Sequence, residues 1–235
     1  MFTRSQRFYD LIYSWKDYPA EVERLHALIE ERKRAPGNRL LDVACGTGKH
    51  LELLRDHYEV EGLDVDADML AIAGARLPNV RLHRGDFRDF DLGRRYEVVT
   101  CLFSSIAYAR DTAELRLAVA CLSKHVEPGG VLVVEPFVTP DRFVPGQVQQ
   151  LCAEDGDLKL TRMARADVRD GRALFEFHYL VGQPEGIEHV VEPHVVSLFR
   201  DEDYVEAFGM VGMDVDHDPD GLMGRGLYLG VRPLR

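Results

Sequence analysis

The chain has 235 residues, 46% of them apolar, which is enough to bury one sizeable core. Its 29 basic and 40 acidic residues give a formal net charge of -11. Nucleic-acid binding would need a basic face, so the charge disfavours DNA and RNA and favours small-molecule or protein ligands. We see no signal peptide and no membrane-spanning segment. The four cysteines form no C-x-x-C pair and the histidines lack metal-ligand spacing, so we expect a cytoplasmic protein without a bound metal.

The first strong signal along the chain is a buried strand that runs into a glycine turn. Residues 39–44 are nearly continuously apolar, with one acid, as in a strand covered on both faces. Gly46 and Gly48 allow the backbone to turn tightly and to approach a ligand. Residues 49–57 carry leucines at helical spacing. A strand, a glycine turn and a helix in this order predict a ligand pocket at the carboxyl end of the strand.

Spacing separates the glycine-rich motifs that could produce this pattern. A P-loop would need a glycine in place of Val43 and a hydroxyl residue in place of His50, and a dinucleotide fingerprint would need a glycine in place of Leu51. What remains is the D-x-A-C-G-T-G form of residues 42–48, which resembles motif I of class I S-adenosylmethionine-dependent methyltransferases. A structural turn without a ligand is the alternative interpretation.

The next two strands end in candidate cofactor residues. Residues 58–63 predict a strand that ends in Asp64, about twenty residues after the glycine turn, where an acid would meet a ribose diol. Asp66 is a plausible N-cap of the following helix, and Met69 either flanks an adenine or is plain core. After a third strand at residues 80–84, the resemblance places Asp86 at the exocyclic amine of adenine, with Phe87 beside it, although turn chemistry also explains Gly-Asp.

The remaining elements continue an α/β alternation around one antiparallel segment. The hairpin signals are Arg169-Asp170-Gly171 and Gly182-Gln183-Pro184, and they predict that residues 141–197 are mainly antiparallel. A stop at Glu127-Pro128-Gly129-Gly130 separates the second long helix from the fifth strand. The other predicted elements are strands at 96–103, 131–135, 211–216 and 227–231 and helices at 111–125 and 201–208.

Six motifs together narrow the resemblance. They are F-Y-D-L-I-Y with K-D-Y, L-L-D-V-A-C-G-T-G-K-H-L, G-D-F-R-D-F, T-C-L-F-S-S-I, E-P-G-G-V-L-V-V-E-P and G-R-G-L-Y-L-G-V. This set resembles the TDP-amino-sugar N,N-dimethyltransferases of deoxysugar biosynthesis over nearly the whole chain. The chain departs from that family where E-P-W-W-F-P becomes residues 135–140, E-P-F-V-T-P, and where G-G-P-S-G-R-G becomes residues 220–226, D-G-L-M-G-R-G.

The resemblance implies a Rossmann-like class I methyltransferase fold. We expect a mostly parallel seven-stranded sheet with helices on both faces and an antiparallel insertion after the fifth strand. The single domain would comprise an N-terminal helical lid at 1–35, a cofactor-binding half at 36–140, the insertion at 141–198, and a C-terminal helix with a strand pair at 199–235. A homodimer through the insertion is a further expectation, because exposed strands with alternating apolar residues readily bury one face on a partner.

The resemblance also implies the cofactor and the reaction. Methyl transfer from S-adenosylmethionine to an amine needs a neutral lone pair in line with the methyl group and no covalent intermediate. Tyr13 is the first candidate for contact with the methyl or the amine, and Tyr108 could orient the amine; plain packing is the alternative for both. Residues expected to bind S-adenosylmethionine are Asp42, Ala44, Cys45, Gly46, Gly48, Asp64, Val65, Met69, Asp86, Phe87, Leu102 and Tyr18.

On the acceptor side, we expect Ser104, Phe137 and Arg225 to bind the substrate. Arg225 lies between two glycines and is the best candidate to hold a phosphate or carboxylate; a solvated arginine in a turn is the alternative. The favoured function is N-methylation of a small molecule, most plausibly a nucleotide-linked amino sugar. The alternatives are a methyltransferase for another small metabolite, such as an amino acid, an amine or a hydroxylated product, and a non-catalytic protein that binds S-adenosylmethionine.

Overall fold

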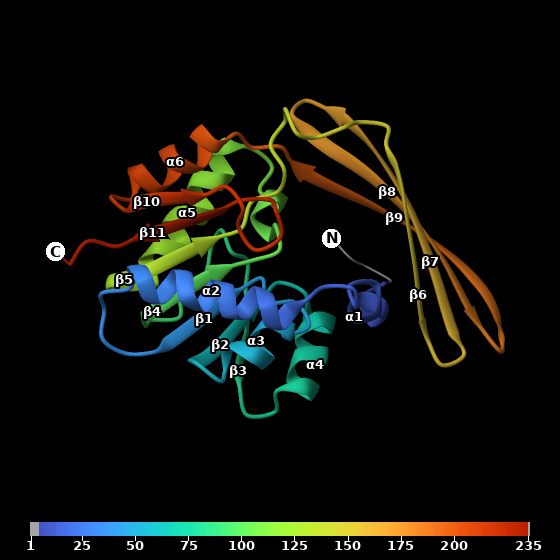
Figure 1. The fold of residues 1–235 in the computed structure, drawn as a ribbon, viewed down its shortest axis with the longest axis horizontal. Coiled ribbons are helices and arrows are strands. Elements are labelled where there is room, and N and C mark those ends of the chain that lie inside the picture. Colours follow the sequence, from blue (N-terminus) through green and yellow to red (C-terminus); the bar gives the residue numbers. More distant parts are fainter. Residues whose placement is uncertain (1–4, 235) are drawn as a thin grey trace. The chain divides into compact units, whose positions relative to one another are not determined.

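The computed structural model describes residues 5–234, and these form two compact units. The mixed-sheet unit comprises Asp17–Thr139 and residues 199–234; the hairpin unit comprises residues 5–16 and Pro140–Leu198. Figure 1 shows the elements of both units. No helix within residues 5–234 combines the length and the apolar character that crossing a membrane requires.

The mixed-sheet unit is built on one sheet with the strand order β10-β11-β5-β4-β1-β2-β3. Neighbouring strands from β5 to β3 pair in parallel, and only β11 runs antiparallel to its neighbours. This confirms the predicted mostly parallel seven-stranded sheet. The strands are β1 Arg39–Val43, β2 Glu59–Asp64, β3 Arg81–Arg84, β4 Tyr96–Cys101, β5 Val126–Val134, β10 Asp214–Asp218 and β11 Leu227–Val231.

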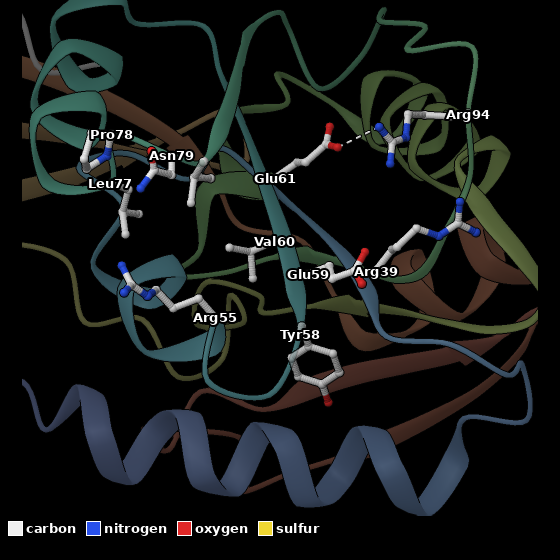
Figure 2. A pocket seen from close by; sticks show the side chains of 11 residues that line it. Arg39, Arg55, Tyr58, Glu59, Val60, Glu61, Leu77, Pro78, Asn79 and Arg94 are labelled. Carbon is white, nitrogen blue, oxygen red and sulfur yellow. Dashed lines mark ion pairs between the residues drawn. The ribbon is translucent and has the colours of Figure 1, made fainter.

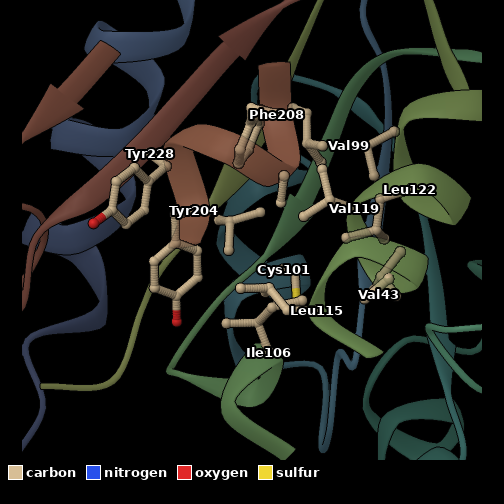
Figure 3. Packing of buried hydrophobic residues seen from close by; sticks show 14 of the residues in the cluster. Val43, Val99, Cys101, Ile106, Leu115, Val119, Leu122, Tyr204, Phe208 and Tyr228 are labelled. Carbon is tan, nitrogen blue, oxygen red and sulfur yellow. The ribbon is translucent and has the colours of Figure 1, made fainter. Parts of the chain in front are cut away.

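Helices cover both faces of this sheet because its central strands are apolar on both faces. In β5, Val131 and Val133 pack in the cluster that contains α2 and α3, whereas Leu132 and Val134 pack in the cluster that contains α5 and α6. Figure 3 shows the second cluster, with Phe208 of α6 near Val119 of α5. The helices are α2 Tyr18–Arg32, α3 Lys49–Leu54, α4 Ala67–Arg76, the 3-10 helix η2 Ser105–Tyr108, α5 Thr112–Lys124 and α6 Asp201–Met210.

Aspartates cap three of these helices and so define where they begin. Asp66 accepts hydrogen bonds from the backbone N–H groups of Asp68 and Met69, which confirms the predicted N-cap of α4. Asp17 caps α2 and Asp111 caps α5 in the same manner, each through a backbone N–H three residues further on.

The prediction that Glu127-Pro128-Gly129-Gly130 precedes the fifth strand was wrong, because β5 already begins at Val126. Tyr96 pairs with Val126 and Val98 pairs with Val131, so the P-G-G segment bulges opposite Glu97. A Cβ on Gly130 would lie 2.7 Å from the Glu97 carbonyl oxygen. Glycine therefore permits a bulge within the ladder where we expected a break.

Three other predicted boundaries also need correction. The helix expected over residues 49–57 ends at Leu54. The strand expected over 96–103 ends at Cys101, because Phe103 and Ser104 adopt positive φ angles of 52° and 62°. The strand expected over 211–216 is displaced to Asp214–Asp218, since α6 continues to Met210 and Gly212 turns the chain at φ 70°.

The hairpin unit confirms the antiparallel insertion. Its sheet has the order β6-β7-β8-β9, with β6 Val148–Asp155, β7 Leu158–Arg169, β8 Arg172–Gln183 and β9 Gly186–Ser197. Asp170 and Gly171 form the predicted turn between β7 and β8 with φ angles of 52° and 71°, as a two-residue hairpin turn requires. The N-terminal elements η1 Gln6–Phe8 and α1 Tyr9–Ile12 pack on this sheet through a cluster of Phe8, Ile12, Leu160, Tyr179, Val181 and Val190.

We expect Gly62→Ala in β2 to destabilise the protein. The added Cβ would lie 2.7 Å from Leu51 Cδ1 and 2.8 Å from Cys45 Sγ, so it would overpack the contact between α3 and the glycine turn. The expected loss of unfolding free energy is about 1–3 kcal/mol, measured by urea denaturation. Gly74→Ala within α4 is the matched control, because its Cβ meets Leu82 at an ordinary 3.7 Å. That change should be neutral or stabilising, and equal effects of the two substitutions would contradict this account.

Candidate active site

The glycine turn after β1 is held in an unusual backbone conformation. Ala44, Gly46 and Gly48 have φ angles of 61°, 55° and 76°. The Cys45 N–H donates to the Leu63 carbonyl oxygen at 3.0 Å and thereby fixes the turn against β2. A Cβ placed on Gly46 would meet no atom within 4 Å. The turn therefore presents bare backbone to open space, which is what close approach of a ligand requires.

Asp64 ties the glycine turn to the end of β2. Its Oδ2 accepts the Gly46 N–H at 2.8 Å and its Oδ1 accepts the Asp66 N–H at 2.9 Å. Burial raises the pKa of this carboxyl, although the backbone N–H donors oppose the shift. A carboxylate offers about four acceptor positions, so the two backbone bonds leave capacity for the predicted ribose hydroxyls. Val65 follows directly, and its carbonyl oxygen accepts from Arg84.

Asp42 lies within β1, where it is fully buried. It accepts a hydrogen bond from the Thr100 hydroxyl of β4 at 2.7 Å. Burial raises the pKa of Asp42 to about 6, while His50 and Thr100 lower it. Because only 2% of Asp42 is exposed, its position suits support of the turn from within the sheet more than direct ligand contact.

The start of α2 contacts the start of α3 through a histidine. The His50 Nε2 lies 3.0 Å from Glu21 Oε2, and the Tyr18 ring packs edge-on against the His50 ring with centroids 5.0 Å apart. Tyr18, predicted as a cofactor residue, is half-buried here, one turn before Glu21 in α2.

Asp86 lies after β3 and is held by an arginine two residues further on. Arg88 donates through Nε to Asp86 Oδ1 at 2.9 Å and through its terminal nitrogen to Oδ2 at 2.5 Å. These bonds lower the pKa of Asp86 and fix its carboxylate as an acceptor. Phe87 is partly buried and packs against the core. Met69 and Leu102, which the sequence also predicts as cofactor residues, are both buried.

Three predicted acceptor residues lie together at the carboxyl ends of β4 and β5. Arg225 donates to the Ser104 hydroxyl oxygen at 3.0 Å, and its guanidinium carbon lies 5.2 Å from the Phe103 ring centroid and 5.8 Å from that of Phe137. The Ser104 hydroxyl in turn donates to the carbonyl oxygen of Pro136 at 2.7 Å. The structure therefore brings Ser104, Phe137 and Arg225 into one cluster, which we call the arginine cluster.

Glu135 at the end of β5 is a residue that sequence reasoning missed. Its side chain is completely buried, and its Oε2 accepts the Phe103 N–H at 2.6 Å. This bond stabilises the positive φ angle of Phe103 and so helps to shape the arginine cluster. An acid that follows an apolar strand was the available signal, the same signal that identified Asp64. Tyr108 lies half-buried in η2, four residues after Ser104.

Tyr13 belongs to the hairpin unit, whereas the other predicted site residues belong to the mixed-sheet unit. It packs against the cluster around Tyr179, and Arg162 of β7 donates to its hydroxyl at 3.3 Å with the guanidinium 5.6 Å from the Tyr13 ring centroid. This is the packing role that the sequence left open as the alternative. A role of Tyr13 in methyl transfer stays a prediction.

A separate cavity of about 540 Å³ lies beside the amino ends of β1 and β2, whereas the glycine turn follows the carboxyl end of β1 (Figure 2). It is lined near the amino ends of β1 and β2 by Arg39, Glu59 and Glu61, with Arg94 at its rim. Arg94 pairs with Glu61 at 2.7 Å. The glycine turn lies at the carboxyl edge of the same strands, so this cavity is distinct from the predicted site.

Comparison with known proteins identifies the family. A sequence profile described as a methyltransferase domain matches residues 40–130. The chain is 47% identical to a dTDP-3-amino-3,6-dideoxy-alpha-D-glucopyranose N,N-dimethyltransferase from Streptomyces fradiae, over 95% of this chain and 89% of the relative. It is 38% identical to a dTDP-4-amino-2,3,4,6-tetradeoxy-D-glucose N,N-dimethyltransferase from Saccharopolyspora spinosa, over 95% and 91% of the two chains. The chain belongs to this family of class I methyltransferases.

Solved structures agree with the fold of this methyltransferase. Streptomyces venezuelae DesVI matches with a TM-score of 0.92 at 38% identity, over 99% of this chain and 100% of the other. CalS10, an amino pentose methyltransferase from Micromonospora echinaspora solved with S-adenosylmethionine bound, matches with a TM-score of 0.87 at 37% identity, over 99% and 98%. The predicted Rossmann-like fold, N-methyltransferase class and S-adenosylmethionine cofactor are confirmed.

The residues of the methyltransferase fit this cofactor. The bare backbone at Gly46 leaves room for a ligand, Asp64 retains acceptor capacity that ribose hydroxyls would use, and the carboxylate of Asp86, held by Arg88, would accept from an amine. Burial raises the pKa of Cys45 and of Cys101 well above the ordinary value, so both thiols stay protonated at neutral pH and lack nucleophilic character. The site therefore offers binding and orientation in place of covalent catalysis.

We expect Asp42 to make stability depend on pH. Its pKa is raised from 3.8 to about 6 in the folded state, so its contribution is fully present below pH 4 and is lost as pH rises through 6. Asp42→Asn keeps an oxygen acceptor for Thr100 and removes the titration. Relative to wild type, the variant should gain about 2 kcal/mol of unfolding free energy between pH 4 and pH 7, measured by urea denaturation. The exposed Asp56→Asn is the control, and a constant Asp42→Asn difference across this range would contradict the assignment.

Proposed function

We propose that this methyltransferase transfers methyl groups to the amino nitrogen of a nucleotide-linked deoxy amino sugar. The carrying observation is that relatives at 47%, 42% and 38% identity, each matched over 95% of this chain, are all named as N,N-dimethyltransferases of dTDP-amino sugars. The arginine cluster supports the proposal, because it places a cation beside aromatic rings at the edge of the sheet where the cofactor turn lies.

Methyl transfer requires the protein to bind and orient both substrates and to allow the amine to lose a proton. When bound, S-adenosylmethionine supplies a sulfonium methyl group that is already activated for transfer. The residues of the chain hold the acceptor amine as a free base in line with that methyl and exclude water. Each transfer converts the neutral amine into an ammonium ion. That ion must lose one proton before the nitrogen has a lone pair for a second methyl group. We propose that Tyr108, at the end of η2 and four residues after Ser104 of the arginine cluster, orients the amine.

Arg225 is proposed to hold the diphosphate of the acceptor. A guanidinium has five N–H donors, and within residues 5–234 the described bond of Arg225 to Ser104 uses one of them. The flanking rings of Phe103 and Phe137 exclude water and so strengthen an ion pair with phosphate. Its loop is anchored to α2, where Arg24 donates to the Gly221 carbonyl oxygen at 2.6 Å and pairs with Asp218 at 2.7 Å.

Mass spectrometry of reaction mixtures tests the function directly. The purified protein is incubated with S-adenosylmethionine and, separately, with a dTDP-3-amino sugar, a dTDP-4-amino sugar, and free amines and amino acids. We expect one and then two added methyl groups on a sugar nucleotide. Methylation confined to the free amines or amino acids would establish the alternative function, and absence of methylation with intact cofactor binding would support a non-catalytic protein.

We expect Arg225→Ala to raise the KM for the sugar nucleotide about tenfold to a hundredfold, the usual effect of losing a bidentate charged bond. The affinity for S-adenosylhomocysteine, measured by calorimetry, should stay unchanged. Arg95→Ala removes an exposed arginine before β4 and serves as the matched control. Equal loss of both affinities in the Arg225 variant would show a structural role.

We further propose that the two units act as one methyltransferase domain and that the protein is cytoplasmic. We also propose that two copies associate through the exposed face of the hairpin sheet. The strand register places Met163, Leu180 and Val191 on one face of that sheet, each between 43% and 50% exposed. A monomer rarely leaves such a face open. Light scattering after gel filtration should give the mass of a dimer, and a concentration-independent monomer mass would refute the association.

A further inference from the structure

The buried carboxylate of Glu114 accepts hydrogen bonds from two separate loops. We define the nucleobase loop as residues 85–90, which contains Asp86, and the acceptor loop as residues 102–111, which contains Ser104 and Tyr108. Glu114 lies in the first turn of α5, where Asp111 caps the helix by accepting the Glu114 N–H at 2.9 Å. Only 11% of the Glu114 side chain is exposed.

The bond from Glu114 to the nucleobase loop runs through Arg88. One terminal nitrogen of Arg88 donates to Glu114 Oε2 at 2.7 Å, while the other nitrogens hold both oxygens of Asp86. The Arg88 backbone N–H also donates to Asp86 Oδ1 at 2.9 Å. The guanidinium is therefore fixed at both ends, and Asp86 cannot rotate without breaking a bond to it.

The bonds from Glu114 to the acceptor loop run through Arg110. The Arg110 backbone N–H donates to Glu114 Oε2 at 2.9 Å, and its Nε donates to Oε1 at 2.6 Å. Arg110 follows η2 after one residue, so this contact fixes the end of the segment that carries Tyr108. The pKa of Glu114 is lowered to about 2, first by Arg110 and also by Arg88, so the carboxylate is charged at physiological pH.

We propose that Glu114 is a positioning residue for both substrates. It acts through Arg88 on Asp86, which is proposed to receive the adenine amine, and through Arg110 on the acceptor loop. This inference rests on the proposed sites of the cofactor and of the sugar nucleotide. It explains why Glu114 is bonded to two arginines from separate loops, since the helix dipole accounts for an acid in the first turn of α5 and does not account for those two partners.

Calorimetry with S-adenosylhomocysteine tests the cofactor half and needs no turnover. We expect Arg88→Gln and Glu114→Gln each to raise the dissociation constant about tenfold, as loss of a charge-assisted bond does. The double variant should be no weaker than Arg88→Gln alone, because Glu114 acts through Arg88. Additive effects of the two substitutions, or affinities within twofold of wild type, would overturn this half.

Steady-state kinetics tests the acceptor half, with the sugar nucleotide that the wild-type protein methylates as the substrate. We expect Glu114→Gln to raise the acceptor KM severalfold and Arg88→Gln to leave it unchanged. An unchanged acceptor KM in the Glu114 variant would overturn this half. If wild type methylates no sugar nucleotide, the proposed function fails, while the calorimetric series still decides the role of Glu114 and Arg88.

Glu206→Gln is the matched control for a merely structural effect. It removes a glutamate–arginine pair between the same helix and α6, in which Arg116 lies 2.9 Å from Glu206 and neither residue belongs to the two loops. Thermal unfolding is measured for every variant. The control should leave both ligand constants unchanged, and the same ligand defects in the control would show that loss of any pair on α5 produces them.

Discussion

The hydrogen bonds of the Asp64 carboxylate are the constraint on which the cofactor side of this protein depends. The glycine turn leaves the β ladder with three residues at positive φ, a costly conformation for Ala44. Asp64 stabilises it by accepting the Gly46 N–H, and it orients the start of α4 by accepting the Asp66 N–H. One side chain at a strand end thus positions both the turn and the start of the following helix.

Because the central strands are parallel, other buried acids lie at the same carboxyl ends of the strands as Asp64. Asp42, Asp64 and Glu135 belong to β1, to β2 and to the residue after β5, and each is nearly or completely buried. A buried carboxylate is costly unless hydrogen bonds compensate for the lost water. Thr100 offsets part of this cost at Asp42, whose pKa burial still raises, and the Phe103 N–H donates to Glu135. Packing alone would favour apolar residues there, so these acids serve to hold the backbone and side chains at the carboxyl ends of the strands.

Local signals in the sequence predicted much of this architecture and little of the acceptor side. Periodicity predicted the strands and long helices, and the Asp66 cap followed from one residue and its neighbours. The bulge at Gly129 was missed because it depends on Glu97 of the adjacent strand. The bond between Arg225 and Ser104 joins residues 121 positions apart, a separation at which no local pattern gives information. Glu114 was missed for the same reason, since its two arginine partners converge only in the folded chain.

The arginine cluster contains one of the segments in which this chain departs from the family motif. Phe137 and Val138 stand where the family carries two tryptophans, and Phe137 forms one wall beside the Arg225 guanidinium. Smaller side chains in place of large rings give this wall a different shape, and in this chain the wall lies beside a cation that is bonded to Ser104. A phosphate is recognised by charge and donor geometry, whereas a sugar ring is recognised by shape. With Arg225 as the proposed diphosphate contact, the departure from the family pattern lies in the wall beside it, where shape and not charge would distinguish one sugar from another.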